Sequence, residues 1–161
     1  MKELKKVVIG SDKSGFVLKE EIKKFLTDRG YYVEDVGTVD LENWLPFYEV
    51  APRVAKKIQS GEFEKGILIC GTGAGMSIAA NKFKGIYAVA VEGSYTAKMA
   101  QVINNANVLT MGGWVVAPQQ ACDMVERWLN AEFTEGLEEW RKELLKGAQN
   151  KIKEIEEENF K

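Results

Sequence analysis

The sequence predicts an α/β fold in which five parallel strands form one sheet and helices cover both of its faces. Short apolar runs alternate along the chain with segments whose apolar residues recur at helical spacing, and the runs are apolar at almost every position. Strands that are buried on both faces have this composition, which is typical of parallel sheets between helices. The 161 residues suffice for one domain with a sizeable core.

Three strands and two helices are expected in the first 70 residues. The strands cover residues 5–10, 31–37 and 66–70. After the first strand, Ser11 or Asp12 can cap a helix whose apolar residues lie on one face, and Gly30 ends it. After the second strand, apolar residues spaced from Val50 to Ile58 mark another helix.

The rest of the chain continues the alternation and ends in a different kind of helix. The expected elements are a short helix at 75–82, a strand at 86–91, a helix at 94–103, a strand at 107–112 and a helix at 118–131. Beyond Phe133 the tail is helical but thinly apolar, with Leu137, Trp140, Leu144 and Leu145 as its main hydrophobic residues. Such a helix needs another surface. We therefore expect an α/β domain over 1–133 and a C-terminal helical extension over 134–161 that packs on a neighbouring subunit.

Composition argues against several classes of protein. The net charge of −2 and pI near 5.4 give no broad cationic surface for nucleic acid or an anionic membrane. No apolar run approaches the ~18 residues of a membrane span, and no secretory signal is evident, which predicts a cytoplasmic protein. Cys70 and Cys122 are then expected to be free thiols. The chain has no histidine and no cluster with metal-ligand spacing, so we expect neither a metal nor a cofactor.

The segment "ILICGTGAGMSIAANK" carries the strongest chemical signal. Cys70 ends a strand directly before a turn with Gly71, Gly73 and Gly75. Ligands of parallel sheets bind at the carboxyl ends of strands, and the backbone N–H groups of such a turn suit a phosphate or an enolate oxygen and favour a thiolate. Free cysteines and glycine turns also occur for packing alone, so these residues leave both interpretations open. Cys122, on the apolar face of a helix, is expected to be structural.

A dinucleotide site is a weaker interpretation of the same turn. Met76 stands where the G-x-G-x-x-G pattern requires its last glycine, and the motif follows the third strand rather than the first. Glu92, a tempting ribose ligand, does not have the required spacing. A nucleotide-binding module therefore remains only a weak alternative.

Four segments together resemble one family. "VVIGSDKSGFVLKEEIKKFL", "GILICGTGAGMSIAANK", "GIYAVAV" and "NNANVLTMG" are similar, in order and spacing, to the ribose-5-phosphate isomerase B and galactose-6-phosphate isomerase family, over about Val7 to Arg141. The resemblance implies a three-layer Rossmann-like sandwich and metal-independent aldose–ketose isomerisation of a sugar phosphate. It also implies a homodimer, or a dimer of dimers, whose active sites combine residues of two subunits.

The resemblance also implies roles for individual residues. The cysteine that matches Cys70 is the base that moves a proton between C1 and C2, and Thr72 is expected to assist it. The glycine turn holds the negative oxygen of the enediolate, which agrees with the backbone donors expected there. The expected substrate-binding residues are Asp12, Lys13, Gly71, Gly73, Ala74, Gly75, Ser77, Asn104 and Arg141. Asn81 is expected to support the site.

Other positions depart from the family pattern. Lys13 and Ile103 stand where the family has histidines. The family histidine at the position of Ile103 is the acid or base that opens the sugar ring. Isoleucine cannot transfer a proton, and loss of such a group typically costs roughly 10²–10⁴ in rate.

The phosphate-binding positions are changed as well. Trp114 replaces an arginine and either stacks on a sugar or packs, Leu137-Glu138 replaces Arg-His, and Arg141 is retained. Lys13 can replace only part of that charge, because lysine lacks the bidentate fork of arginine. Trp44 and Tyr48 lie in a loop that either borders the site or simply covers it.

Two hypotheses explain these departures. The chain is an isomerase for a substrate that needs no ring opening, such as a tetrose phosphate or another open-chain sugar phosphate, or it is a non-catalytic partner subunit of a heteromeric isomerase. Cys70, the intact glycine turn and Asn104 favour the first.

Overall fold

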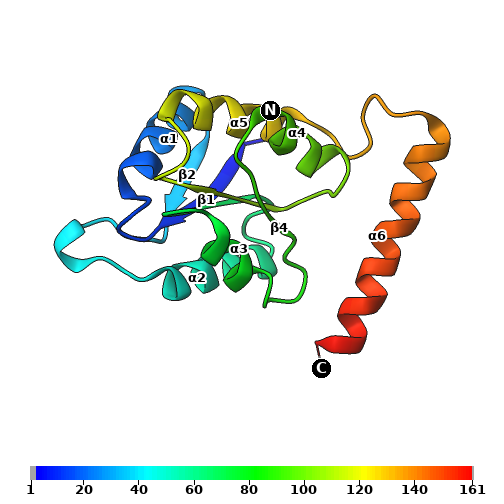
Figure 1. The fold of residues 1–161 in the computed structure, drawn as a ribbon, viewed down its shortest axis with the longest axis horizontal. Helices are drawn as coiled ribbons and strands as arrows, with labels where there is room; N and C mark the ends of the chain where they lie inside the picture. The colour runs from blue at the N-terminus through cyan, green and yellow to red at the C-terminus, as the bar shows by residue number, and fades with distance from the viewer. Residues whose placement is uncertain (1–2, 161) are drawn as a thin grey trace.

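The computed structural model describes residues 3–160 as a sheet between two layers of helices (Figure 1). The strands are β1 (Lys6–Ser11), β2 (Tyr32–Asp35), β3 (Gly66–Cys70), β4 (Ala88–Ala90) and β5 (Val108–Gly112). All neighbouring pairs are parallel, in the order β2-β1-β3-β5-β4. The predicted five-stranded parallel α/β fold is therefore confirmed.

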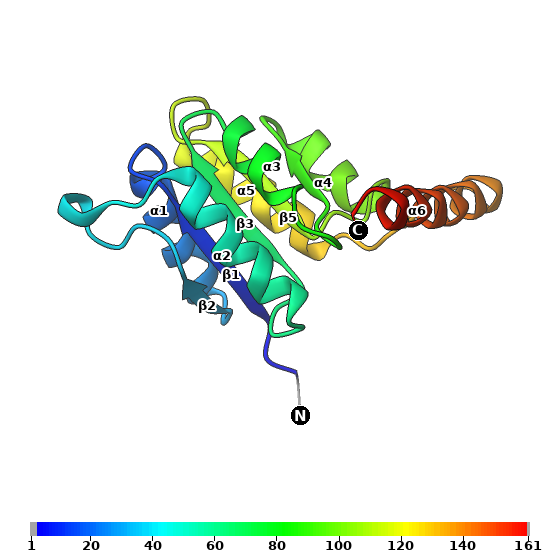
Figure 2. The ribbon, with the colours of Figure 1, turned by 90° about the horizontal axis from the view of Figure 1, so that it is seen from below.

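Helices cover the two faces of the sheet unequally. Helices α1 (Phe16–Asp28), α4 (Ser94–Val102) and α5 (Pro118–Asn130) pack on one face, and α2 (Phe47–Gln59) and α3 (Ala74–Ala80) pack on the other (Figure 2). Successive residues of a strand point to opposite faces. Ile9 thus joins the core under α1, whereas Val8 joins the core under α2. This two-sided burial explains why the central strands are apolar at nearly every position.

The strand order reverses between β1 and β3, and the parallel arrangement brings their carboxyl ends together. Chain connections from β1 lead outward to β2, whereas those from β3 lead to the opposite half of the sheet. The backbone N–H of Asp12, just after β1, donates to the carbonyl of Ile69 in β3 at 3.3 Å. Crevices at such a reversal are the usual ligand sites of open α/β sheets.

One helix start differs from its prediction. Neither Ser11 nor Asp12 caps α1, which begins at Phe16 after Gly15. The carboxylate of Asp12 instead accepts the N–H of Gly15 at 3.0 Å in a turn that precedes the helix. The extra turn keeps Asp12 at the end of the sheet.

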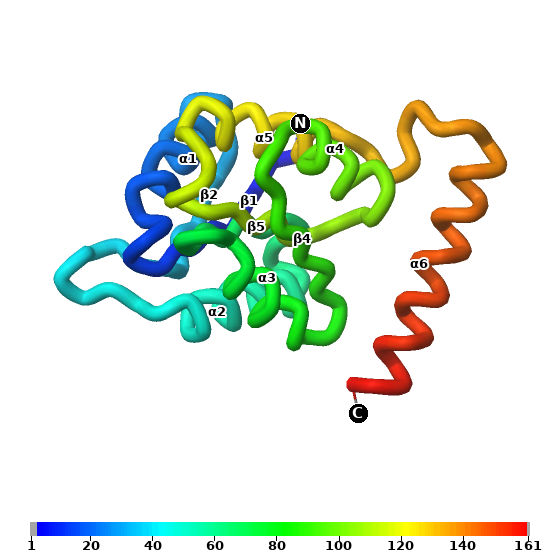
Figure 3. Tube along the Cα trace, viewed as in Figure 1, coloured from blue at the N-terminus to red at the C-terminus, as the bar shows by residue number. Residues whose placement is uncertain are grey.

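Helix α6 (Glu139–Asn159) lies apart from the α/β body (Figures 1 and 3). It is tied to the loop before β4 near its end, where Glu156 accepts the N–H of Gly85 at 2.5 Å and the hydroxyl of Tyr87 at 2.9 Å. None of its residues is buried, and Trp140 and Leu144 are each 61% exposed. Within residues 3–160, no helix has the length and apolar character needed to cross a membrane.

Candidate active site

The turn after β3 surrounds the thiol of Cys70 with backbone groups. The side chain is buried, and its Sγ accepts the N–H of Gly73 at 3.1 Å. Gly73 has φ +87°, a conformation that glycine adopts at little cost. Behind the turn, the N–H of Gly113 donates to the carbonyl of Cys70 at 2.7 Å. The thiol therefore lies at the base of a backbone-built turn that is anchored to β5.

The exposed side of this turn carries the other predicted groups. Thr72 and Ala74 are exposed, and the Thr72 hydroxyl accepts the N–H of Ala74 at 3.3 Å. Asp12 is half-buried at the end of the neighbouring strand, next to the exposed Lys13. Burial raises the pKa of the Asp12 carboxyl, against the opposing effect of its hydrogen bond from Gly15. The structure thus brings Asp12 and Lys13 to the same edge of the sheet as Cys70 and the glycine turn at 71–75, which together are called the thiol turn.

Ser77 and Asn81 bond to β4 instead. The Ser77 hydroxyl donates to the carbonyl of Ala88 at 3.3 Å. The amide of Asn81 donates to the same carbonyl at 2.9 Å and accepts the Ala88 N–H at 2.8 Å. These contacts hold the short edge strand against α3, which is a supporting role.

Asn104 and Arg141 lie away from Cys70 of the same chain. Asn104 follows α4 and precedes β5, at the amino edge of the sheet, whereas Cys70 is at the carboxyl edge. Arg141 is exposed on α6, with its guanidinium 5.9 Å from the centre of the Trp140 ring. Asn104 and Ile103 also border a cavity of about 190 Å³, whose other lining residues are Tyr87, Leu145, Ala148, Gln149 and Ile152.

Two aromatic side chains border the glycine turn. The ring of Trp114 lies so close to Gly71 that a Cβ there would be 2.7 Å from it, although Trp114 is 74% exposed. Phe47 approaches Gly75 in the same way, at 3.1 Å. Sequence reasoning considered Trp44 and Tyr48 in this loop and did not identify Phe47. The one feature of the sequence that hinted at Phe47 was Gly75, because a residue without a side chain leaves room for a neighbouring ring.

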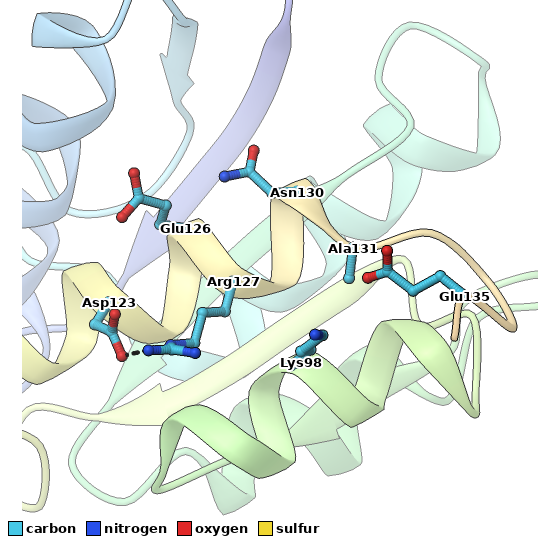
Figure 4. A pocket seen from close by; sticks show the side chains of 7 residues that line it. All are labelled: Lys98, Asp123, Glu126, Arg127, Asn130, Ala131 and Glu135. Atoms are coloured by element: carbon cyan, nitrogen blue, oxygen red, sulfur yellow. Dashed lines mark hydrogen bonds and ion pairs between the residues drawn. The ribbon is translucent and has the colours of Figure 1, made fainter. Parts of the chain in front are cut away.

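A separate charged cavity lies between α4 and α5, away from the thiol turn (Figure 4). Its volume is about 360 Å³, and its walls mix Lys98 and Arg127 with three carboxylates. Arg127 Nε donates to the Asp123 carboxylate at 2.9 Å, so these two opposite charges offset each other and charge of one sign is not concentrated in the cavity. None of the predicted site residues lines this cavity.

Comparison with known proteins identifies the family. The model of the Ribose/Galactose Isomerase family matches residues 7–145. The chain belongs to this family. The resemblance noted over about Val7 to Arg141 is confirmed, and the chain is an enzyme of the aldose–ketose sugar isomerase class.

Three relatives place the chain within the ribose/galactose isomerases. It is 59% identical to a 4-deoxy-4-sulfo-D-erythrose isomerase from Clostridium sp. (strain MSTE9), over 94% of this chain and 96% of that one. It is 44% identical to D-erythrulose-4-phosphate isomerase 2 from Mycolicibacterium smegmatis, over 80% of this chain and 86% of that one. Ribose-5-phosphate isomerase B from Clostridium thermocellum superposes with a TM-score of 0.86 at 43% identity, covering 95% of this chain and 98% of that one.

Proposed function

We propose that this chain interconverts a four-carbon aldose and the corresponding 2-ketose, each with an anionic group at C4. The observation that carries this proposal is an intact thiol turn in a chain without histidine, with Ile103 at the family's ring-opening position. Groups for moving a proton between carbons are present, whereas the usual group for opening a sugar ring is not. A substrate that is always open matches both facts.

The chemistry of C4 explains why such a substrate stays open. A furanose ring forms when the C4 hydroxyl oxygen attacks the C1 aldehyde. In a tetrose that carries phosphate on O4, or a sulfonate on C4 in place of the oxygen, that hydroxyl does not exist. The two relatives named for C4-modified four-carbon sugars, at 59% and 44% identity, support this substrate class.

The small number of positively charged side chains expected at the site favours a sulfonate over a phosphate. A sulfonate carries one negative charge, whereas a phosphate monoester carries between one and two near neutral pH. The expected cations are Lys13, which replaces a family histidine, and the retained Arg141, and both are single exposed side chains. We therefore propose 4-deoxy-4-sulfo-D-erythrose as the first substrate to test and D-erythrose 4-phosphate as the second.

In the proposed reaction Cys70 works as a thiolate base. It removes the proton from C2, the C2–H electron pair forms the C1=C2 bond, and the carbonyl electrons move to O1. Backbone N–H groups of the turn stabilise this negative oxygen. The Thr72 hydroxyl passes the O2 proton to O1, the O2 electrons form the C2=O bond, and the C1=C2 electron pair takes the proton back from Cys70 at C1. The product is an isomer of the substrate, so no metal, oxidant or cofactor is required.

A complete site requires a second copy of the chain. Asn104 and Arg141 lie far from Cys70 within one chain, so a second copy must supply them if they bind substrate. The exposed apolar residues of α6 support a homodimer, or a dimer of dimers. On this proposal, residues 134–161 form an extension that packs on the partner of the 1–133 domain. We also propose a cytoplasmic location, consistent with two free cysteines.

The decisive experiment compares three sugars and two cysteine variants. We expect turnover of both four-carbon substrates, slow turnover of D-ribose 5-phosphate, and solvent deuterium at C1 or C2 of the product. Cys70→Ser should lower kcat by roughly 10²–10⁴, the usual cost of losing a proton-transfer group. Cys122→Ser is the matched control and should keep full activity. Binding of a sugar without turnover would favour the partner-subunit hypothesis, and a thermal shift with nucleotides alone would favour a nucleotide module.

A further inference from the structure

A buried hydroxyl lies directly beneath the glycine turn. Thr110 is in the middle of β5, paired with Leu68 of β3 and Ala90 of β4, and its side chain is fully buried. Its Oγ1 donates to the carbonyl of Gly73 at 2.9 Å. A buried hydroxyl is costly unless it is hydrogen-bonded, and here the bond goes to the turn that holds Cys70.

This bond restrains the residue that contacts the thiol. The N–H of Gly73 donates to Cys70 Sγ, while its carbonyl accepts both the Thr110 hydroxyl and the N–H of Ser77 at 3.1 Å. Glycine has more accessible backbone conformations than any other residue, so an N–H on a glycine keeps its direction only if neighbours hold it. Thr110 is the side chain that does so from the sheet.

We propose that Thr110 is a positioning residue for the proposed base, because its hydroxyl holds Gly73 so that the Gly73 N–H stays on the Cys70 sulfur. The inference rests on the proposed function for the role of Cys70. Thr110 is fully buried, so it acts through Gly73 and not on the substrate. Shape alone does not require a hydroxyl here, since valine has nearly the same volume and suits a buried strand well.

The test removes the hydroxyl without changing the shape. Thr110→Val and Thr110→Ser are compared in a Cys122→Ser background, where Cys70 is the remaining thiol. The first readout is the rate of Cys70 alkylation by iodoacetamide at pH 7 divided by the rate at pH 9.5. This ratio compares the reactivity of the same sulfur at two pH values and cancels differences in access. A hydrogen bond from a backbone N–H supports a charged acceptor more than a neutral one, so partial loss of this bond should lower the ratio about 3–10-fold in Thr110→Val.

The second readout is catalysis. In Thr110→Val we expect kcat to fall about tenfold with KM within about twofold, because substrate binding is untouched while the base is less well held. Thr110→Ser keeps the hydroxyl and should restore both readouts to within about threefold of the parent. Thr110→Ser and Thr110→Ala repeat the comparison with smaller side chains, so the result does not depend on the valine variant folding.

A matched control separates positioning from a general loss of stability. Thr38 is also fully buried, and its hydroxyl accepts the N–H of Leu45 at 3.0 Å, so this bond joins two residues of the loop after β2 and none of the glycine turn. Thr38→Val should lower the melting temperature and leave the alkylation ratio unchanged. An unchanged ratio and kcat in Thr110→Val, or an equal fall in Thr38→Val, would overturn the proposal. Alkylation needs no substrate, so a wrong substrate proposal shows separately as a parent enzyme with no turnover.

Discussion

Replacing Gly73 by alanine tests how rigidly the turn is built. Gly73 has φ +87°, and a Cβ placed on it would lie 2.9 Å from the Cα and carbonyl carbon of Met111. These are backbone atoms of β5, which cannot move aside without disturbing the sheet. Gly30 provides a matched control, because its φ is +84° and a Cβ there meets nothing within 4 Å. Gly30→Ala thus has the same dihedral cost without the collision.

The two variants should differ by the cost of the collision alone. A left-handed conformation costs an alanine about 1 kcal/mol, and a forced contact in a packed interior adds about 2 kcal/mol. For a chain of this length, 1 kcal/mol corresponds to about 2–4 °C in melting temperature. We expect Gly30→Ala to lose about 2–4 °C and Gly73→Ala about 6–12 °C. The entropy that alanine removes from the unfolded chain is common to both and cancels.

Calorimetry and the isomerase assay give independent readouts of this variant. A displaced turn moves the Gly73 N–H away from Cys70 Sγ, and a misplacement of about 1 Å can cost about 10² in rate. Gly73→Ala should therefore lose most of its kcat, whereas Gly30→Ala keeps it. Equal melting temperatures for the two variants would show that a Cβ on Gly73 does not clash with Met111. Full activity in a destabilised Gly73→Ala would show that catalysis does not require this turn geometry.

Two further predictions concern buried and tethering groups. Lys19 is fully buried, with its Nζ 2.7 Å from Asp35. Lys19→Met should cost about 3 kcal/mol in unfolding free energy by denaturant titration, the low end for a broken buried pair because Lys23 still contacts Asp35. Burial, and then the Glu156 carboxylate, raise the pKa of Tyr87 to about 12. Because this folded-state pKa exceeds the ordinary value of 10.0, the α6 tether contributes fully below pH 10 and is lost as pH rises through about 12. Glu156→Gln should lower that pKa in an absorbance titration referenced to Tyr87→Phe.

The central strands were the most predictable elements, for a physical reason. β1, β3 and β5 are buried on both faces, so almost every residue in them is apolar and their limits agree with the predictions to within one residue. The edge strands pair on one side only, and β2 and β4 are shorter than the predicted 31–37 and 86–91. The start of α1 was predicted too early, because Asp12 serves a turn as readily as a helix cap.

The residues of the candidate site fall into two groups, those placed by the strand pattern and those placed by contacts distant in sequence. Cys70, its glycines and Asp12 were predictable, since each ends or follows a strand whose direction the alternating pattern indicates. Phe47 and Thr110 were missed because both act through backbone contacts that are distant in sequence. For Thr110 the available signal was one polar residue inside the apolar strand "VLTMG". Asn104 and Arg141 lie away from Cys70 of the same chain, so the proposal that they share a site with it requires a second chain, which no local pattern specifies.

This division suggests how the proposed substrate can change while the proton-transfer reaction stays the same. The thiol turn is held by backbone geometry, by the φ of Gly73 and by contacts with β5, so changes there should cost stability as well as catalysis. Positions 114, 138 and 141 carry exposed side chains, at which substitutions usually change stability by less than about 0.5 kcal/mol. Residues that we propose to bind the anionic end of the substrate can therefore be exchanged at little cost to the fold. A Trp114→Arg substitution should accordingly alter the preference between sulfonate and phosphate while leaving the melting temperature nearly unchanged.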